Sequence, residues 1–331
     1  MTENAIEAID LRKTYSDSWF RSNRYTALKG VSFAVPRGEI FGLLGPNGAG
    51  KTTFVKIMLG IVARSGGDAN VMGADAGSQS ARQRIGYLPE NLRMRRHHTA
   101  NTALEFYGGL NGLSVSEVRK RRGDLLKKVG LESWADAGIK KYSKGMLQRL
   151  GLAQAILHDP DLLILDEPTD GLDPQARADV REIMLQLKNE GKTIFVNSHI
   201  LQEVELVCDS VAILDLGVLK YCGSVENIGN FISSQSGMRT GSGITFWLDC
   251  EEAKLRATLE VSPTETVTPR GEGRVEYFTD RLDVQFVNEC IDRLRANDVR
   301  IIEISQKHVS LEQAFLAILS KESPSNGGNQ S

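Results

Sequence analysis

A glycine-rich stretch constrains this chain more than any other feature. Residues 45–52 read Gly-Pro-Asn-Gly-Ala-Gly-Lys-Thr, which fits the phosphate-binding pattern G-x-x-x-x-G-K-[ST]. An apolar run of strand length, residues 39–44, precedes the loop, and a helix-forming run, residues 53–59, follows it. Strand, glycine loop and helix start are the context that this motif requires. We therefore expect an α/β fold with a nucleotide phosphate site.

The residue types in this loop suit a polyphosphate. Glycines lack a Cβ atom, so their backbone can take positive φ and lie close to phosphate oxygens, while the following helix adds the positive end of its dipole. The Lys51 ammonium, at about 4 Å and an effective dielectric of about 20, would gain about 4 kcal/mol per phosphate charge before desolvation. We expect the Thr52 hydroxyl to ligate a Mg²⁺ ion that bridges the outer phosphates. The expected cofactor-binding residues here are Gly45, Pro46, Asn47, Gly48, Ala49, Gly50, Lys51, Thr52 and Thr53.

Two carboxylates follow a second apolar run. Residues 162–165 are Leu-Leu-Ile-Leu, typical of a parallel strand buried on both faces, and Asp166 and Glu167 stand at its end. Ligands of open α/β sheets bind at the carboxyl ends of strands. Adjacent strand residues point to opposite sides, so we expect Asp166 to face the Mg²⁺ and Glu167 to face an attacking water. A third strand, residues 193–196, leads to His199, for which we expect a function at the same sheet edge.

Residues 99–157 have helical patterns. Ser114 and Glu117 form a capping-box pattern that opens a helix through Lys128. Residues 142–145, Tyr-Ser-Lys-Gly, precede another helix with a 3.6-residue apolar period. Its Ser143 and Gly145 indicate a second anion site at a helix start, although serine there is more often only a cap.

Composition narrows the class of protein. The net formal charge of −2 implies no bulk attraction to nucleic acid or to an anionic membrane. The start of the chain is polar, unlike a secretory signal, and no apolar run reaches the roughly 18 residues that span a bilayer. Another chain would therefore have to supply any path across a membrane. The four cysteines lack Cys-x-x-Cys spacing and are typical of free thiols in a reducing compartment: Cys208, Cys222, Cys250 and Cys290.

Two further segments leave alternatives open. Residues 15–26 hold four aromatic side chains, any of which is either a stacking partner for a base or a packed surface ring: Tyr15, Trp19, Phe20 and Tyr25. Residues 93–98, Arg-Met-Arg-Arg-His-His, would meet phosphates or an acidic partner, but a solvated loop is the favoured interpretation because interleaved aromatics are missing.

The pattern of elements resets after residue 235. Residues 233–243 have linker composition. Beyond them we expect strands at 244–250, 266–268, 274–278 and 299–305, with helices at 251–260, 283–296 and 310–320. This gives a nucleotide-binding domain over 1–235 with a helical part at about 92–158, a small α+β domain over 236–320, and a disordered tail over 321–331.

Together these motifs resemble the nucleotide-binding subunit of an ABC transporter, of the exporter-type group made as a separate ATPase, over about residues 5–235. The resemblance implies a P-loop NTPase core with a helical subdomain. Residues 45–52 are similar to the Walker A loop, 162–167 to the Walker B strand, and 170–173 to the D-loop. By resemblance, His199 is the switch histidine and Tyr15 stacks on the base. Residues 310–316 resemble part of an accessory domain that is regulatory or supports dimers.

The sequence departs from this family in two places. Residues 142–146, Tyr-Ser-Lys-Gly-Met, align with a signature that is usually Leu-Ser-Gly-Gly-Gln, and keep only its Ser143 and Gly145. Where many members carry glutamine, this chain has Glu90, which we expect either to orient water or to meet the Mg²⁺.

The resemblance also implies a mechanism. Two ATPase subunits, either identical or homologous, would meet head to tail around two ATP molecules, with Mg²⁺ at each. Glu167 would polarise the attacking water and His199 would contact the γ-phosphate. The partner would be an integral membrane permease, so the chain would be cytoplasmic and peripheral on the inner face of the cell membrane. No nucleic acid partner is expected.

Two other functions fit parts of the sequence. The first is a soluble ABC-type ATP switch that acts on nucleic acid or the ribosome, but such relatives usually carry two ATPase units or long coiled coils, and neither pattern occurs here. The second is a nucleotide-binding regulator without turnover, which the Asp166–Glu167 pair argues against. The sequence does not name the cargo.

Overall fold

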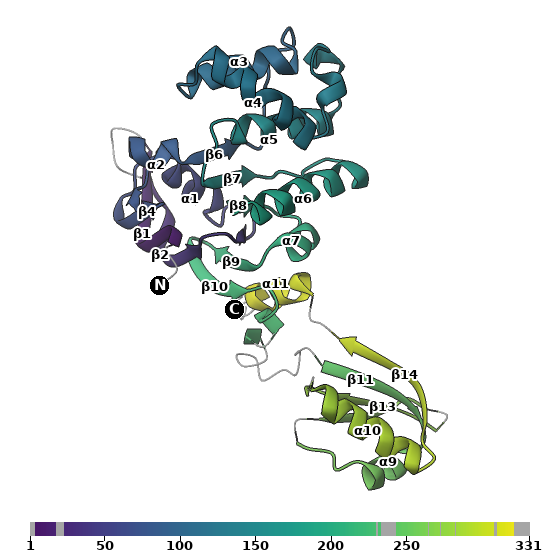
Figure 1. The fold of residues 1–331 in the computed structure, drawn as a ribbon. Helices are drawn as coiled ribbons and strands as arrows, with labels where there is room; N and C mark the ends of the chain where they lie inside the picture. Colours follow the sequence, from purple (N-terminus) through teal and green to yellow (C-terminus); the bar gives the residue numbers. More distant parts are fainter. Residues whose placement is uncertain are drawn as a thin grey trace, which may run out of the picture. The chain divides into compact units, whose positions relative to one another are not determined.

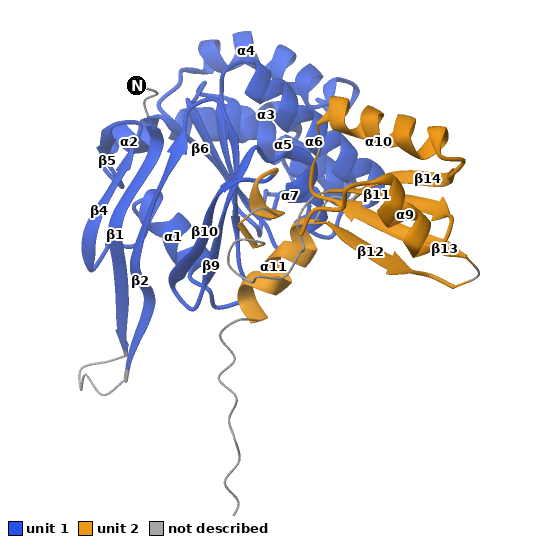
Figure 2. Cartoon of the chain, turned by 90° about the horizontal axis from the view of Figure 1, so that it is seen from below, with its two compact units in different colours: residues 1–225 blue, residues 226–331 orange. Residues whose placement is uncertain are grey.

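The computed structural model of this chain describes residues 4–17, 23–229, 231–232, 243–263, 265–271, 273–281, 283–307 and 310–320. The chain divides into two compact units, residues 1–225 and 226–331 (Figures 1 and 2). The sequence placed this division at residue 235. The linker residues 233–242 and the tail 321–331 lie outside the described residues.

A six-stranded, mostly parallel sheet forms the centre of the first unit. Its strand order is β10-β9-β3-β8-β7-β6, and only β10 runs antiparallel to its neighbour. Every residue of β3, β7 and β8 is buried, as their apolar runs predict. The hairpin that the sequence predicts at 211–216 and 218–222 is confirmed as β9 and β10. The strands are β3 (Ile40–Leu44), β6 (Ile85–Leu88), β7 (Leu162–Asp166), β8 (Thr193–Asn197), β9 (Ser210–Asp215) and β10 (Val218–Ser224).

The first unit also contains an antiparallel sheet of order β2-β1-β4-β5, which shares a hydrophobic core with the central sheet. Its first two strands are longer than the strands at 5–12 and 31–35 that the sequence predicts, because residues 15–17 and 23–26 continue the pairing of β1 with β2. The prediction missed β4 and β5, which lie in a stretch that reads as polar and glycine-rich. Gly67 shows why glycine is needed there: at φ +73°, a Cβ atom would stand 2.1 Å from the Asp10 carbonyl oxygen. The strands are β1 (Asn4–Asp17), β2 (Asn23–Pro36), β4 (Gly66–Val71) and β5 (Ala74–Asp75).

Four phenylalanine rings stack between the two sheets. Phe33 of β2 and Phe54 of α1 lie 4.9 Å apart between ring centroids, and Phe54 and Phe195 lie 5.8 Å apart. Phe41 of β3 continues the stack at 5.6 Å from Phe33. These buried rings fix α1 between the sheets, so the loop before α1 is held on a rigid base.

Helices cover the central sheet, and α3, α4 and α5 form a separate helical part beside β6 (Figure 1). The capping box of α4 is confirmed: the Ser114 Oγ accepts the Glu117 N–H at 3.3 Å, and the Glu117 carboxylate accepts the Ser114 N–H at 2.8 Å. The helices of this unit are α1 (Lys51–Met58), α2 (Gln79–Gln83), α3 (Ala100–Leu110), α4 (Val115–Lys128), α5 (Lys144–Ile156), α6 (Pro174–Asn189) and α7 (Leu201–Val207), with 3-10 turns η1 (Glu132–Trp134) and η2 (Ile139–Lys141).

The second unit is an antiparallel sheet of order β12-β13-β11-β14 with α9 and α10 on one face (Figure 2). Its own core includes Phe246, Leu255 and Tyr277, all fully buried or nearly so. The expected order of strands and helices is confirmed. The elements are β11 (Gly243–Asp249), α9 (Glu252–Thr258), β12 (Thr266–Pro269), β13 (Arg274–Thr279), α10 (Val284–Ala296), β14 (Arg300–Lys307) and α11 (Leu311–Ser320).

Candidate nucleotide site

The phosphate-loop motif lies between β3 and α1, as predicted. Gly45, Gly48 and Gly50 all have positive φ, at +155°, +83° and +107°. A Cβ atom on Gly45 would stand 2.3 Å from the Leu214 carbonyl oxygen, and one on Gly50 would stand 2.5 Å from the Ala27 carbonyl oxygen. A Cβ on Gly48 would meet no atom within 4 Å, so this residue faces open space. The loop therefore requires glycine for backbone reasons and leaves one side free for a ligand.

Lys51 is the first residue of α1, and its side chain is turned back onto the loop. The Nζ donates hydrogen bonds to the carbonyl oxygens of Gly45 at 2.6 Å and Pro46 at 3.2 Å. Burial lowers the pKa of the ammonium, and the charges of Glu167 and Asp166 oppose this shift. A buried cation held only by neutral carbonyl groups is well placed to exchange them for anionic phosphate oxygens.

Asp166 ends β7 and has a polar neighbour on each adjacent strand. The Asn197 side chain of β8 donates a hydrogen bond to it at 2.5 Å, and the Tyr87 hydroxyl of β6 is near enough for the charge of Asp166 to raise its pKa. Burial and the charges of Asp166 and Glu90 raise the pKa of Tyr87 to about 12, so this hydroxyl stays protonated and remains a donor. Sequence analysis missed Tyr87 and Asn197 as partners. The sequence shows that Asn197 follows an apolar strand run, as Asp166 does, but only the sheet register shows that the two residues are paired.

The Asp166 carboxylate and the Thr52 hydroxyl suit a Mg²⁺ ion because this ion needs few protein ligands. Mg²⁺ is usually held by one or two carboxylates together with substrate phosphates, and rarely by a full protein cage. Within the described ranges no group of three His, Cys, Asp or Glu side chains forms such a cage. The Asp166 carboxylate and the exposed Thr52 at the loop end fit the smaller set. Glu90 is exposed just after β6, and its charge reaches Tyr87.

Glu167 and His199 form a contact pair. The His199 Nδ1 lies 2.8 Å from Glu167 Oε2, and the His199 backbone N–H donates to the same oxygen at 3.3 Å. The expected alternation of side chains assumed that Glu167 continues the strand. The structure shows that it does not. It takes φ +50°, and its N–H donates to the Asn197 carbonyl at 2.8 Å. The carboxylate is therefore aimed by a backbone turn and by His199, whose side chain is 55% exposed.

Two tyrosines from β1 and β2 lie beside the loop. The Tyr15 hydroxyl lies 3.5 Å from Thr53 Oγ1, and the Lys13 ammonium lies 4.9 Å from the centre of the Tyr15 ring. The Tyr25 hydroxyl donates to the Gly48 carbonyl at 3.2 Å. Trp19 and Phe20, the other aromatic candidates, lie outside the described residues.

The signature segment contacts the D-loop segment of the same chain. Ser143 is the N-cap of α5, and its Oγ accepts the Met146 N–H at 3.2 Å. A Cβ atom on Gly145 would lie 2.8 Å from the Ala176 Cβ, so close packing on α6 already requires glycine there. Lys144 lies 3.5 Å from Asp170 between Nζ and Oδ2.

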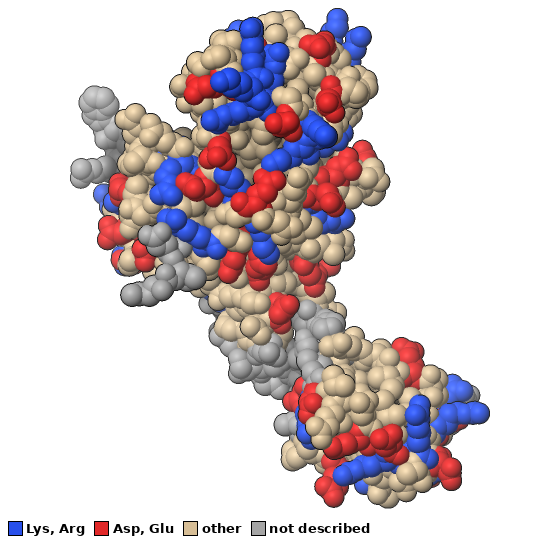
Figure 3. Space-filling model, in the orientation of Figure 1, with Lys and Arg blue, Asp and Glu red and all other residues tan. Residues whose placement is uncertain are grey.

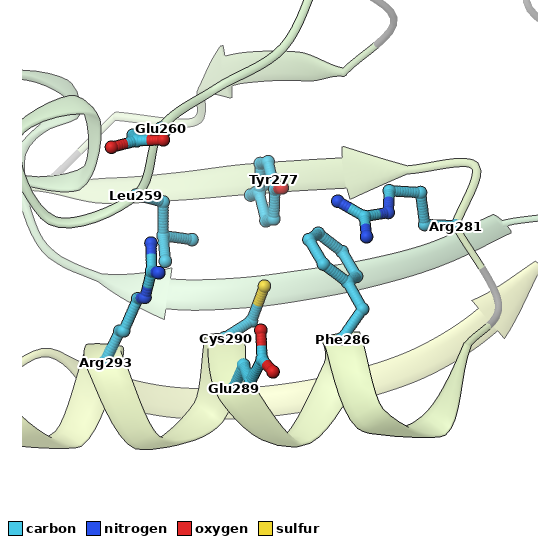
Figure 4. A pocket seen from close by; sticks show the side chains of 8 residues that line it. All are labelled: Leu259, Glu260, Tyr277, Arg281, Phe286, Glu289, Cys290 and Arg293. Carbon is cyan, nitrogen blue, oxygen red and sulfur yellow. The ribbon is translucent and has the colours of Figure 1, made fainter.

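A separate hollow of about 160 Å³ lies in the second unit, between α10 and β13 (Figure 4). Its lining carries no glycine loop, and its charged groups are two arginines and two glutamates. Burial, together with the charge of Glu265, raises the pKa of the Cys290 thiol to about 11. The thiol stays protonated at neutral pH, so it is a poor nucleophile. The phosphate chemistry belongs to the first unit.

Known proteins resemble this chain along nearly its whole length. A family model described as ABC transporter matches residues 28–170. An uncharacterized ABC transporter ATP-binding protein of Nostoc sp. is 48% identical over 327 residues, which cover 98% of this chain and 92% of that protein. The chain belongs to the ABC transporter ATP-binding proteins.

Two further similarities involve mainly the first unit. The Nod factor export ATP-binding protein I of Ralstonia nicotianae is 39% identical over 209 residues, or 62% of this chain and 63% of that protein. A solved ATP-binding subunit of an ABC transporter is 32% identical with a TM-score of 0.60, and the match covers 71% of this chain and 94% of that structure. The fold expected from the resemblance is confirmed.

Membership of this family establishes the general activity. ABC transporter ATP-binding proteins bind ATP and couple its hydrolysis to transport, and they act with membrane permeases. In the part of this chain that the structure describes, no helix combines the length and the apolar character needed to cross a bilayer.

Proposed function

We propose that this ABC ATP-binding protein drives an exporter, with Glu167 orienting the attacking water and His199 facing the γ-phosphate. The contact of 2.8 Å between His199 Nδ1 and Glu167 Oε2 carries this proposal. It fixes the carboxylate and leaves the imidazole Nε2 available to a phosphate oxygen. General-base help of this kind is typically worth about 10²–10⁴-fold in rate.

The triphosphate binds in the loop before α1. The N–H groups at Gly48 and Gly50 and the start of α1 supply donors and a partial positive charge. Lys51 exchanges its two carbonyl acceptors for phosphate oxygens. Tyr15 stacks on the base, and Tyr25 holds the loop through Gly48. The other loop residues of the site are Pro46, Asn47, Ala49 and Thr53.

Thr52 and Asp166 would hold the Mg²⁺ ion. When bound, Mg²⁺ would neutralise charge that develops during phosphoryl transfer. Asn197 orients the Asp166 carboxylate toward that position. Glu90 lies near enough to influence Tyr87, which supports a role at the edge of the ion's shell.

The functional unit contains two ATPase subunits, either two copies of this chain or this chain with a homologue. Ser143 is exposed at the start of the 13-residue helix α5, where unpaired N–H groups and the dipole favour an anion. A partner placed head to tail would receive its own ATP phosphates against this helix start, with Gly145 allowing α5 to pack closely on α6. Such an isologous arrangement closes with two identical sites.

The permease docks near Glu90 to Asn101. Residues 89–98 form a loop without helix or strand, and the Arg95 guanidinium lies 5.7 Å from the Phe106 ring centre. Phe106 and Leu110 are 42% and 70% exposed, so they add apolar area to this surface. Figure 3 shows basic side chains gathered over the helical part at the top of the view. An acidic, partly apolar segment of the permease fits the surface formed by residues 90–101 together with Phe106 and Leu110.

Charge reversal tests this docking surface. We expect the variant Arg95→Glu with Arg96→Glu to co-purify with less permease, because it repels an acidic segment. The matched control reverses two exposed lysines on α4, Lys120→Glu and Lys127→Glu. Equal loss of permease in both variants, or none in either, contradicts this position for the docking site.

Export and location complete the proposal. One relative is named for Nod factor export, which supports the outward direction. We place the chain in the cytoplasm, bound peripherally to its permease at the inner face of the cell membrane. The test of the ATPase function measures heat and phosphate release when the full-length chain meets ATP and Mg²⁺. Saturable heat and steady phosphate release are expected, and the absence of both contradicts the proposal.

A further inference from the structure

Four charged or polar side chains form a row from the start of α5 to the water-orienting carboxylate. Lys144 Nζ lies 3.5 Å from Asp170 Oδ2. Asp170 Oδ1 lies 4.0 Å from His199 Nε2, and His199 Nδ1 lies 2.8 Å from Glu167 Oε2. The row therefore links a lysine of the signature segment to the proposed catalytic pair.

Two glycines keep the ends of this row together. Gly171 has φ +59°, and a Cβ atom there would stand 2.2 Å from Lys144 Nζ, so the lysine ammonium occupies the space that any side chain would fill. Gly145 allows α5 to approach Ala176 of α6 closely. The start of α5 thus rests on residues 170–176, and the Lys144–Asp170 pair is built into this contact.

We propose that Lys144 is a positioning residue for ATP hydrolysis, which holds the Asp170 carboxylate away from His199 Nε2. This inference rests on the proposed roles of His199 and Glu167. The His199 nitrogen that faces Asp170 is Nε2, which does not contact Glu167. It is therefore the nitrogen that must reach the γ-phosphate.

The distances show why a cation is needed. At 4.0 Å the Asp170 carboxylate is too far from Nε2 for a hydrogen bond, but a shift of about 1 Å would make one. An imidazole between two carboxylates would have both nitrogens occupied and would meet the phosphate as part of an anionic cluster. The lysine opposes this by attracting the other carboxylate oxygen of Asp170, Oδ2, while Oδ1 is the oxygen nearer to Nε2. The side chains of Lys144 and Asp170 are 58% and 47% exposed, so the pair contributes little to folding stability.

The variant Lys144→Gln tests the inference in the full-length chain. We expect kcat for ATP to fall about tenfold, the effect of one misplaced charge-assisted hydrogen bond, with KM changed less than about twofold. The unfolding temperature should not change, and Lys144→Arg should keep most of the turnover. Lys192→Gln is the matched control, because it removes a lysine that pairs with Asp159 at 2.5 Å in another part of the unit.

A double variant separates positioning from direct contact with nucleotide. In Lys144→Gln with Asp170→Asn, no carboxylate remains to capture Nε2, so kcat should return to within about threefold of Asp170→Asn alone. A double variant as slow as Lys144→Gln contradicts the inference and shows that Lys144 acts by another route. Unchanged kcat in Lys144→Gln also contradicts it. Wild-type protein that hydrolyses no ATP contradicts the proposed function instead.

Discussion

Asp166 and Glu167 are neighbours in the chain, but they have different surroundings. Asp166 is 6% exposed and receives a hydrogen bond from Asn197. Glu167 leaves the strand at positive φ and pairs with His199, whose ring reaches the surface. The Asp166 carboxylate is therefore fixed inside the sheet edge, where we propose the ion, while the Glu167 carboxylate is fixed beside His199, which we propose contacts the nucleotide.

At this scale, Glu167→Gln and His199→Ala should have separable effects. The glutamine keeps the size of Glu167 but is a poor base, so we expect turnover to fall about 10²–10⁴-fold while ATP binding is retained. His199→Ala should lower kcat more than ATP affinity, because Lys51 and the loop remain. Phosphate release gives kcat, and titration calorimetry gives the affinity. Equal losses of turnover and affinity in His199→Ala would mean that the histidine only supports the structure.

Among the elements, the start of α5 resembles the start of α4 in its local chemistry. Both helices have a serine N-cap, with Oγ accepting an N–H at 3.2 Å from Met146 and at 3.3 Å from Glu117. Only the α5 cap lies in the signature segment. The two caps therefore offer a comparison in which the hydrogen bond to the serine Oγ is shared and the position of the helix is different.

Replacing each cap by alanine should destabilise the unit by about 1 kcal/mol in both cases. Only Ser143→Ala should also reduce ATP turnover, since its hydroxyl and helix start face the partner's phosphates in the proposed dimer. Chemical denaturation measures the first effect, and phosphate release measures the second. If Ser114→Ala slowed hydrolysis as much as Ser143→Ala, the signature role of Ser143 would be wrong.

The elements also show how far sequence alone reaches. The loop at 45–52, the buried strands and the capping boxes follow local rules, so they were predicted. The sequence does not predict strands β4 and β5. Glycines such as Gly67 allow two backbones to approach closely there, and they interrupt the alternation of apolar and polar residues by which a strand is predicted. The Asp166–Asn197 bond and the Lys144–Asp170 pair depend on sheet register and helix packing, which no local pattern encodes.

At the scale of the whole molecule, two separate hydrophobic cores define the two units. One contains Phe33, Phe41 and Phe54, and the other contains Phe246, Leu255 and Tyr277. Only the first unit carries the phosphate loop. Each core is large enough to unfold as its own cooperative transition.

Differential scanning calorimetry of the full-length Glu167→Gln variant should therefore show two transitions. ATP and Mg²⁺ at about 100 times the Kd should stabilise the first unit by about 2.7 kcal/mol and leave the second unchanged. Leu255→Ala, which removes a fully buried side chain, should lower the free energy of unfolding of the second unit alone, by about 2–5 kcal/mol. Only the temperature of the second transition should therefore fall. If the protein shows a single transition, and both ATP with Mg²⁺ and Leu255→Ala shift it, the two units do not unfold independently.

The backbone of Glu167 has a consequence for how this protein can evolve. A non-glycine residue at φ +50° costs about 1–2 kcal/mol relative to a residue without a Cβ atom. A glycine at position 167 would remove this backbone cost, but it would also lose the contacts with His199 and would abolish hydrolysis. Selection for ATP turnover therefore keeps a side chain at this position despite its backbone cost.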